Sequence, residues 1–353
     1  MSRTSLRTML LPLSLAVALS LPLSALASDS QIKWGFVDRT GKMVLAADYE
    51  EALPFYEGLA AVKVDGRWGF IDKTGKLAIE PQFESVSGFS EGVACARKGD
   101  QGYGYIDKSG EFVIQPRFEE ADPFSDGLAS VKLDGRLQFI DRDGTPAIEK
   151  SFAYLCPFSD GLAPVLGPGS VSLSTHGDSY RSEYSPFVFI NKKGEPGIDA
   201  QFQEVVPFSE GLAAVSVGRM QGRNTPDAWG YLDTRGKFAI KPRFNKAHAF
   251  SEGLAAVQTG QWKNLGKGVK SWVAGKFGYI DKRGKLVIKG RFDAADPFSD
   301  GLAAVRVDGK WGYIDRTGKI VIEPRYAGNL CFGEGLAPVM VSNQVDFDKQ
   351  KPY

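Results

Sequence analysis

Two short motifs each recur eight times along the chain, and this repetition constrains the fold more than any other feature. A Trp-Gly-like pair begins at positions 34, 68, 103, 137, 187, 229, 277 and 311, and a Phe-Ser-Asp/Glu-Gly-Leu-Ala-like motif begins at 55, 89, 124, 158, 208, 250, 298 and 332. The first motif precedes the second by 21 residues in every unit. A constant internal distance indicates packed units, and units this short must stack on their neighbours to bury their faces.

Each unit has the signals of antiparallel strands. In one of them, residues 58–64 alternate small or apolar residues with polar ones, and Asp65-Gly66 is a strong hairpin signal. We expect further strands at 67–72 and 77–79, then an irregular stretch, and a short fourth strand at 83–86. After the N-terminal segment no part of the chain has a helical pattern. The sequence therefore predicts an all-β repeat protein.

The repeated Trp-Gly pair resembles that of the bacterial WG-repeat family, and the resemblance covers about residues 31–341. Two units depart from the pattern, with Leu137-Gln138 and Phe187-Val188 in place of Trp-Gly. Membership would imply little chemistry, because WG-repeat proteins are largely without an assigned activity.

The order of the motifs favours an eight-bladed β-propeller-like ring over the alternative, an open β-superhelix. The repeat begins at Lys33-Trp34 without the strand that normally precedes a Trp-Gly strand, and it finishes with such a strand at 336–341. Pairing these two pieces would complete the eighth unit and remove the exposed strand edges at which chains associate.

The first 27 residues are predicted to be a secretory signal peptide, with Arg3 and Arg7 before an apolar stretch and Ala25-Leu26-Ala27 as the cleavage signal. We expect a periplasmic or secreted protein with a WG-repeat domain at 28–341, a short tail at 342–353 and no transmembrane segment. The mature chain would carry 41 basic and 42 acidic residues, a net charge of −1, which gives no reason to expect nucleic acid as a partner.

The sequence contains no recognisable catalytic or metal-binding motif. Its three cysteines, Cys95, Cys156 and Cys331, are an odd number, which excludes a complete disulfide framework and leaves room for one bridge at most. Its two histidines, His176 and His248, are far apart, so no zinc site is expected. Ser174, His176 and Asp178 alternate along one loop, which makes the geometry of a Ser-His-Asp triad improbable. We predict no catalytic residues, no metal and no cofactor.

The repeated polar and aromatic positions are interpreted mainly as structure. The Trp-Gly pairs are expected to pack between neighbouring units, with the glycine allowing close approach. The aspartates that end the second strand suit Asx turns. The acids before each Gly-Leu-Ala would form a circle at one mouth of a ring, as Glu57, Glu91, Asp126, Asp160, Glu210, Glu252, Asp300 and Glu334.

Three consecutive units carry insertions in the same connection, at 167–186, 218–228 and 260–276, and these are the strongest functional candidates. They combine aromatic and cationic residues, a composition that suits an anionic or sugar-bearing partner. The alternative is that the insertions only decorate the blades. The predicted binding residues are Tyr180, Arg181, Tyr184, Arg219, Arg223, Trp262, Lys263, Lys267, Lys270 and Trp272.

These observations together predict an exported, non-enzymatic binding or scaffold module for a cell-envelope protein or glycan. The first alternative is a glycan-active hydrolase or lyase that uses carboxylates at the ring mouth. The second is a self-assembling scaffold, which an open spiral would favour. The sequence leaves the ligand and the oligomeric state open.

Overall fold

The computed structural model describes residues 32–341 except 168–172, 177–178, 183–185, 203, 220–226 and 267–268. The predicted signal peptide and the C-terminal tail lie outside the described residues. No helix in the described part is long and apolar enough to cross a membrane.

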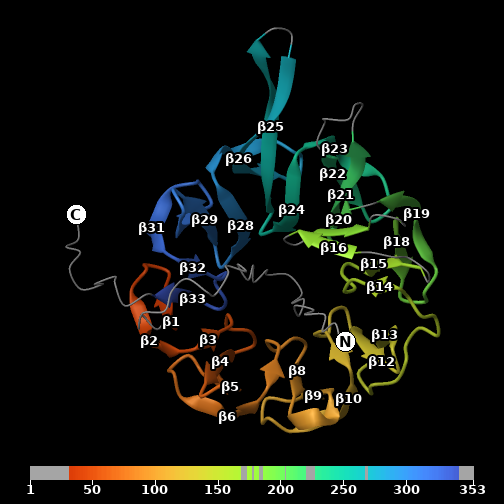
Figure 1. Ribbon diagram of the computed structural model, residues 1–353, viewed down its shortest axis with the longest axis vertical. Helices are drawn as coiled ribbons and strands as arrows, with labels where there is room; N and C mark the ends of the chain where they lie inside the picture. Colours follow the sequence, from red (N-terminus) through yellow and green to blue (C-terminus); the bar gives the residue numbers. More distant parts are fainter. Residues whose placement is uncertain are drawn as a thin grey trace, which may run out of the picture.

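The chain folds into eight antiparallel sheets arranged as the blades of a closed propeller (Figure 1), which confirms the predicted ring. The first four blades, numbered along the chain from the first complete one, contain these strands. Blade 1 contains β3 (Glu51–Ala52), β4 (Ala60–Val64), β5 (Arg67–Ile71) and β6 (Leu77–Phe83). Blade 2 contains β7 (Ser85–Val86), β8 (Ala94–Arg97), β9 (Tyr103–Ile106) and β10 (Phe112–Phe118), with the 3₁₀ turn η1 (Gly99–Gln101) between β8 and β9. Blade 3 contains β11 (Glu120–Ala121), β12 (Ala129–Leu133) and β13 (Arg136–Ile140). Blade 4 contains β14 (Tyr154–Leu155), β15 (Leu162–Leu166), β18 (Phe187–Asn191) and β19 (Pro196–Phe202).

The remaining blades include the two that carry long hairpins and the one that closes the ring. Blade 5 contains β20 (Glu204–Val205), β21 (Leu212–Arg219), β22 (Asp227–Asp233) and β23 (Phe238–Phe244), joined by β16 (Leu173–His176) and β17 (Ser179–Ser182). Blade 6 contains β24 (Lys246–Ser251), β25 (Leu254–Gly266), β26 (Val269–Asp281) and β27 (Leu286–Phe292). Blade 7 contains β28 (Ala294–Ser299), β29 (Leu302–Val307), β30 (Lys310–Asp315) and β31 (Ile320–Tyr326). Blade 8 contains β32 (Gly328–Asn329), β33 (Leu336–Val341), β1 (Lys33–Asp38) and β2 (Met43–Tyr49).

Blade 8 is assembled from both ends of the repeat region. Strand β33 pairs with β1 along its whole length, from Lys33 opposite Val341 to Asp38 opposite Leu336. The strand missing before Trp34 is thus supplied from the C-terminal side, as the order of the motifs predicts.

The predicted irregular stretch and fourth strand were wrong in detail. The outer strand of blade 1 continues to Phe83 instead of ending at residue 79, with a register shift opposite Gly69. A β-carbon at Gly69 would come within 2.6 Å of the Ile79 carbonyl oxygen, so this close approach requires glycine. The short strand that follows, β7, belongs to the next blade and forms its inner strand.

The hydrophobic core lies between the blades. In each of the eight junctions an aromatic residue of one Trp-Gly strand contacts the motif phenylalanine of the next blade, and Phe70 and Phe89 have ring centroids 4.9 Å apart. Trp68 and Trp229 are buried, and Trp34 and Trp311 pack partly buried against the core. The Trp-Gly strands therefore stabilise blade junctions.

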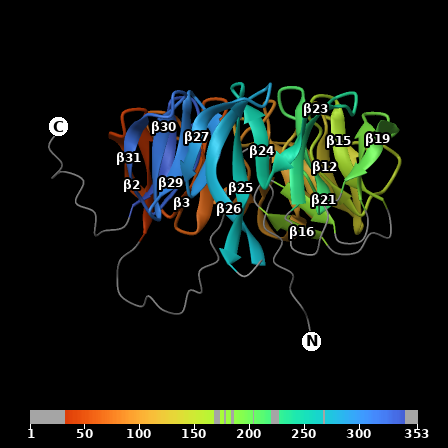
Figure 2. The ribbon, with the colours of Figure 1, turned by 90° about the horizontal axis from the view of Figure 1, so that it is seen from above.

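The two faces of the ring carry different connections. The Phe-Ser-Asp/Glu-Gly turns and the turns after the Trp-Gly strands lie on one face, here called the acid face. The β4–β5 hairpin and its equivalents, three of which are lengthened, lie on the other, here called the insertion face. Figure 2 shows the β25–β26 hairpin projecting from this face.

Candidate binding surfaces

The first insertion reaches across to the neighbouring blade. Its strands β16 and β17 form a hairpin, and β17 pairs with the inner strand β20 of blade 5 through Tyr180 opposite Val205 and Arg181 opposite Glu204. The hairpin therefore lies toward the centre of the ring (Figure 1). Tyr184 lies outside the described residues.

The second insertion lengthens the β21–β22 hairpin of blade 5. Arg219 is the last residue of β21 and lies opposite Asp227 at the start of β22. Arg223 lies outside the described residues.

The third insertion is a two-stranded ribbon that extends β25 and β26. Trp262 lies directly opposite Trp272, Lys263 opposite Ser271, and Asn264 opposite Lys270, while Lys267 lies outside the described residues. The insertion 260–276 has four lysines and no acid. Lys276, at its base, forms an ion pair with Asp293.

The backbone thus brings the insertions to one face but in different directions. The β16–β17 hairpin lies toward the axis of the ring, and the β25–β26 ribbon extends beyond the rim (Figure 1). The aromatic and cationic positions of the first and third insertions are therefore two separate surfaces.

The acid face carries a closed circle of carboxylates, at the positions that the repeat predicts. Each acid has a left-handed backbone, with φ between 51° and 55°, and its carboxylate accepts a hydrogen bond from the motif glycine N–H of the next blade. The shortest N···O distance in each pair lies between 2.6 and 3.1 Å. The pairs are Glu57–Gly92, Glu91–Gly127, Asp126–Gly161, Asp160–Gly211, Glu210–Gly253, Glu252–Gly301, Asp300–Gly335 and Glu334–Gly58.

Cations from the turns after the Trp-Gly strands lie beside this circle. Lys73 Nζ is 2.9 Å from the carboxylate of Glu334, and four further acids have a Lys or Arg partner between 3.1 and 3.3 Å away. Burial opposes ionisation of Glu334, but the hydrogen bonds from Lys73 and from the Gly58 N–H hold its pKa below the usual value. The carboxylates are thus occupied in joining blades.

The aspartates that end the Trp-Gly strands form the expected Asx turns. Asp72 Oδ1 accepts from the Thr74 N–H at 2.8 Å and from the Lys76 N–H at 3.1 Å. In blade 4, Asn191 Oδ1 accepts from the Lys193 and Glu195 N–H groups in the same way.

The carboxyl groups and thiols of the described residues bear on acid catalysis and metal binding. Nine carboxyl groups among them have a lowered pKa, whereas a general acid for glycoside hydrolysis needs a raised one. No group of three His, Cys, Asp or Glu residues that could hold a metal ion occurs among them. Cys95, Cys156 and Cys331 are free thiols, and burial raises the pKa of Cys95 to about 12, so its thiol stays protonated.

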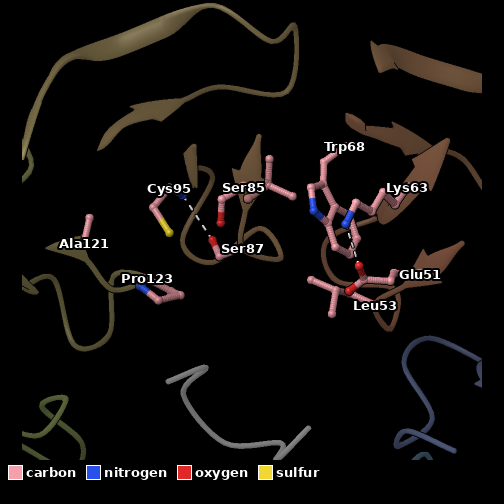
Figure 3. A pocket seen from close by; sticks show the side chains of 10 residues that line it. Glu51, Leu53, Lys63, Trp68, Ser85, Ser87, Cys95, Ala121 and Pro123 are labelled. Atoms are coloured by element: carbon pink, nitrogen blue, oxygen red, sulfur yellow. Dashed lines mark hydrogen bonds and ion pairs between the residues drawn. The ribbon is translucent and has the colours of Figure 1, made fainter. Parts of the chain in front are cut away.

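One cavity was missed by the sequence reasoning. It has a volume of about 270 Å³ and lies between the inner parts of blades 1 and 2 and the inner strand of blade 3 (Figure 3). Its polar residues come from different repeats, and each on its own fits an ordinary repeat position. The sequence feature that could have indicated the cavity is the combination of an acid, a lysine and a tryptophan in one unit, as Glu51, Lys63 and Trp68.

Comparison with known families identifies the same eight repeat units. A family model described as "WG containing repeat" matches eight segments that together cover more than half of the chain, at 34–68, 68–101, 103–136, 139–166, 189–219, 229–261, 277–311 and 311–344. Comparison with curated proteins gives no match.

Several solved structures are similar in fold. A eukaryotic initiation factor has a TM-score of 0.48 at 11% identity, covering 88% of this chain and 98% of that chain. BamB from Moraxella catarrhalis has a TM-score of 0.42 at 9% identity, covering 87% and 91%. The Neurospora crassa Pan2 WD40 domain has a TM-score of 0.35 at 13% identity, covering 90% and 97%.

Proposed function

The chain belongs to the WG containing repeat family, and we propose that it is an exported, non-enzymatic binding module for a cell-envelope protein or glycan. The insertion face of the ring is its binding face, and the β25–β26 ribbon makes the principal contact. The compartment is proposed from the predicted signal peptide at residues 1–27.

The observation that carries this proposal is the length of the ribbon beyond its blade. Strand β24 pairs with β25 only as far as Gln258, and β27 pairs with β26 only from Phe277 onward. Among the described residues, the positions between these limits pair only across the ribbon itself. Both ribbon edges are therefore open to a partner.

An isolated two-stranded ribbon is only marginally stable in water. A partner that covers one edge or one face would supply the missing contacts. The opposed Trp262 and Trp272 and the excess of lysine in this segment suit a partner with sugar rings or negative charge. Cross-strand aromatic pairs in general also stabilise a ribbon, so binding and stability must be measured separately.

The enzyme alternative is not favoured by a specific observation. The carboxylates at the ring mouth accept hydrogen bonds from the next blade, and five of them also have cationic partners. The scaffold alternative depends on an open spiral with free ends, and the ends of this repeat region pair with each other.

The test compares residues 28–353 with a variant in which residues 261–274 are replaced by Asp-Gly. Both proteins are immobilised and incubated with solubilised cell envelope and, separately, with protein-free envelope glycan. We expect a partner that the intact chain retains and the shortened chain loses, with an unchanged melting temperature because the ring contacts are untouched. Capture of the same material by both proteins would contradict the proposal.

Two further variants separate the parts of the surface. Trp262→Thr with Trp272→Thr keeps residues that favour strands but removes the aromatic rings. A variant shortened only in the first insertion, at 168–185, leaves the ribbon intact. The proposal predicts loss of capture with the first variant and retention with the second.

A further inference from the structure

The cavity at blades 1 to 3 is walled on one side by a tryptophan with an unused donor. The Trp68 side chain lines it and is only 9% exposed. Among the described residues, the structure gives the indole N–H no hydrogen-bond partner. Figure 3 shows the indole nitrogen on the side of the ring that faces Ser85 and Cys95. The indole nitrogen is not among the buried side-chain atoms that lack a partner, so it is accessible and can donate a hydrogen bond to a ligand in the cavity.

The charged groups of the cavity neutralise each other. Glu51 and Lys63 are the only charged residues among those that line it, and the Lys63 Nζ is 2.6 Å from the Glu51 carboxylate. The same ammonium lies 5.8 Å from the centroid of the Trp68 ring. The pair presents donors and acceptors but no net charge, which disfavours an ionic ligand.

The remaining lining combines hydroxyl and apolar groups. Ser85 and Ser87 lie between the tryptophan and the opposite wall, while Leu53 and Pro123 contribute apolar surface (Figure 3). The Ser87 hydroxyl donates to the Gly88 carbonyl at 2.8 Å and accepts from the Cys95 N–H at 3.1 Å, which fixes this wall.

We propose that this cavity binds one neutral sugar ring. A sugar presents hydroxyl groups around its edge and apolar C–H groups on its faces, which matches a lining that combines polar side chains with apolar and aromatic ones. The volume of about 270 Å³ lies just below the range for drug-sized ligands, so it accommodates a single ring. This inference does not rest on the ribbon, which belongs to another blade.

The equivalent positions of blades 7 and 3 differ from the site in blade 1. In blade 7, Arg306 lies opposite Trp311, but Ala294 occupies the position of Glu51. In blade 3, Glu120 and Lys132 form the same ion pair at 3.2 Å, but Leu137 occupies the position of Trp68. Blades 7 and 3 thus each lack one element of the site and supply matched controls.

The test uses Trp68→Phe and Trp311→Phe in the full mature chain. Phenylalanine already occupies this strand position as Phe187 and Phe277, so both variants are expected to fold. Binding of D-glucose, D-galactose and N-acetyl-D-glucosamine is followed by ligand-detected NMR, with D-glucuronic acid and D-glucosamine as charged comparators.

We expect at least one neutral sugar to bind the wild type and Trp311→Phe equally. Loss of the N–H donor should weaken its binding to Trp68→Phe about five- to tenfold. Glu51→Gln should weaken binding, and Glu120→Gln should not.

Three results would overturn the proposal: no neutral sugar of the panel binds, the two Trp variants bind alike, or a charged comparator binds as tightly as the neutral sugars. The variant lacking residues 261–274 should retain sugar binding, so failure of the cavity proposal is distinguishable from failure of the ribbon proposal.

Discussion

At the scale of single residues, the turn aspartates couple the fold to pH. Asp315 Oδ1 accepts hydrogen bonds from the Thr317 hydroxyl at 2.6 Å, from the Thr317 N–H at 2.9 Å and from the Lys319 N–H at 3.0 Å. The Thr317 side-chain bond is the main reason that the Asp315 pKa lies below its ordinary value of 3.8. A lowered pKa in the folded state stabilises the fold above 3.8, and this stabilisation is lost as the pH falls through the folded-state pKa.

Asp315→Asn tests this coupling, because Asn191 makes the same turn without a charge. We expect the variant to fold, to be slightly less stable than the wild type at neutral pH, and to lose that difference in acid. The reverse change, Asn191→Asp, should make the stability of the fold depend on pH at this turn, with stability lost in acid as it is at Asp315. Urea unfolding at several pH values measures the stability of both variants. If the stability difference between the wild type and Asp315→Asn were the same at every pH, the coupling would be refuted.

Single residues were also the scale at which the sequence was most informative. The hairpin turn at Asp65-Gly66 and the Asx turn at Asp72 could be predicted, because their hydrogen bonds form between residues that are close in the sequence. The packing role of the Trp-Gly strands followed from their periodicity. The cavity could not be predicted, because Trp68, Ser87 and Pro123 come together only when three blades assemble.

At the scale of the element, the outer strand packs closely on the glycine of the Trp-Gly pair in the six blades that have this glycine. Gly69 faces the backbone of β6, where a β-carbon would lie 2.6 Å from the Ile79 carbonyl oxygen and 2.7 Å from the Pro81 nitrogen. These are backbone atoms of β6, which cannot move out of contact with an added β-carbon by a rotamer change as a side chain could. The strand continues past Ile79, where the sequence predicted irregular structure, and Gly69 lies at its register shift.

Gly69→Ala should therefore destabilise the ring by about 1–3 kcal/mol, as overpacking does in a filled site. Gly167→Ala is the matched control, because a β-carbon at Gly167 would have no atom within 4 Å apart from its own residue and its two chain neighbours. The control should stay within about 0.5 kcal/mol of the wild type. Chemical denaturation compares the two, and equal effects would show that the strand contact at Gly69 is not tight.

The insertions show where element-scale prediction ends. Their length differences placed them on one face, but the pairing of β17 with β20 joins two blades and follows no repeat period. Their directions also depend on which neighbouring strand edge each hairpin meets. The residues predicted for binding consequently lie on two surfaces, and Tyr184, Arg223 and Lys267 fall outside the described residues.

At the scale of the whole molecule, the ring is closed by the same contacts that join its other blades. Gly58 donates to Glu334 as Gly92 donates to Glu57, and Lys73 pairs with Glu334 as Lys108 pairs with Glu57. The order of motifs made this closure predictable, because each missing strand had its counterpart elsewhere in the chain.

Closure sets the position of every site described above, so its most direct test is removal of the closing strand. Thermal unfolding is compared between residues 28–353, a chain that ends at 341 and a chain that ends at 335. The chain ending at 341 keeps β33 and should melt like the full chain, whereas the chain ending at 335 should lose stability across the whole domain. An unchanged melting temperature for the shorter chain would contradict a ring closed by β33 and β1.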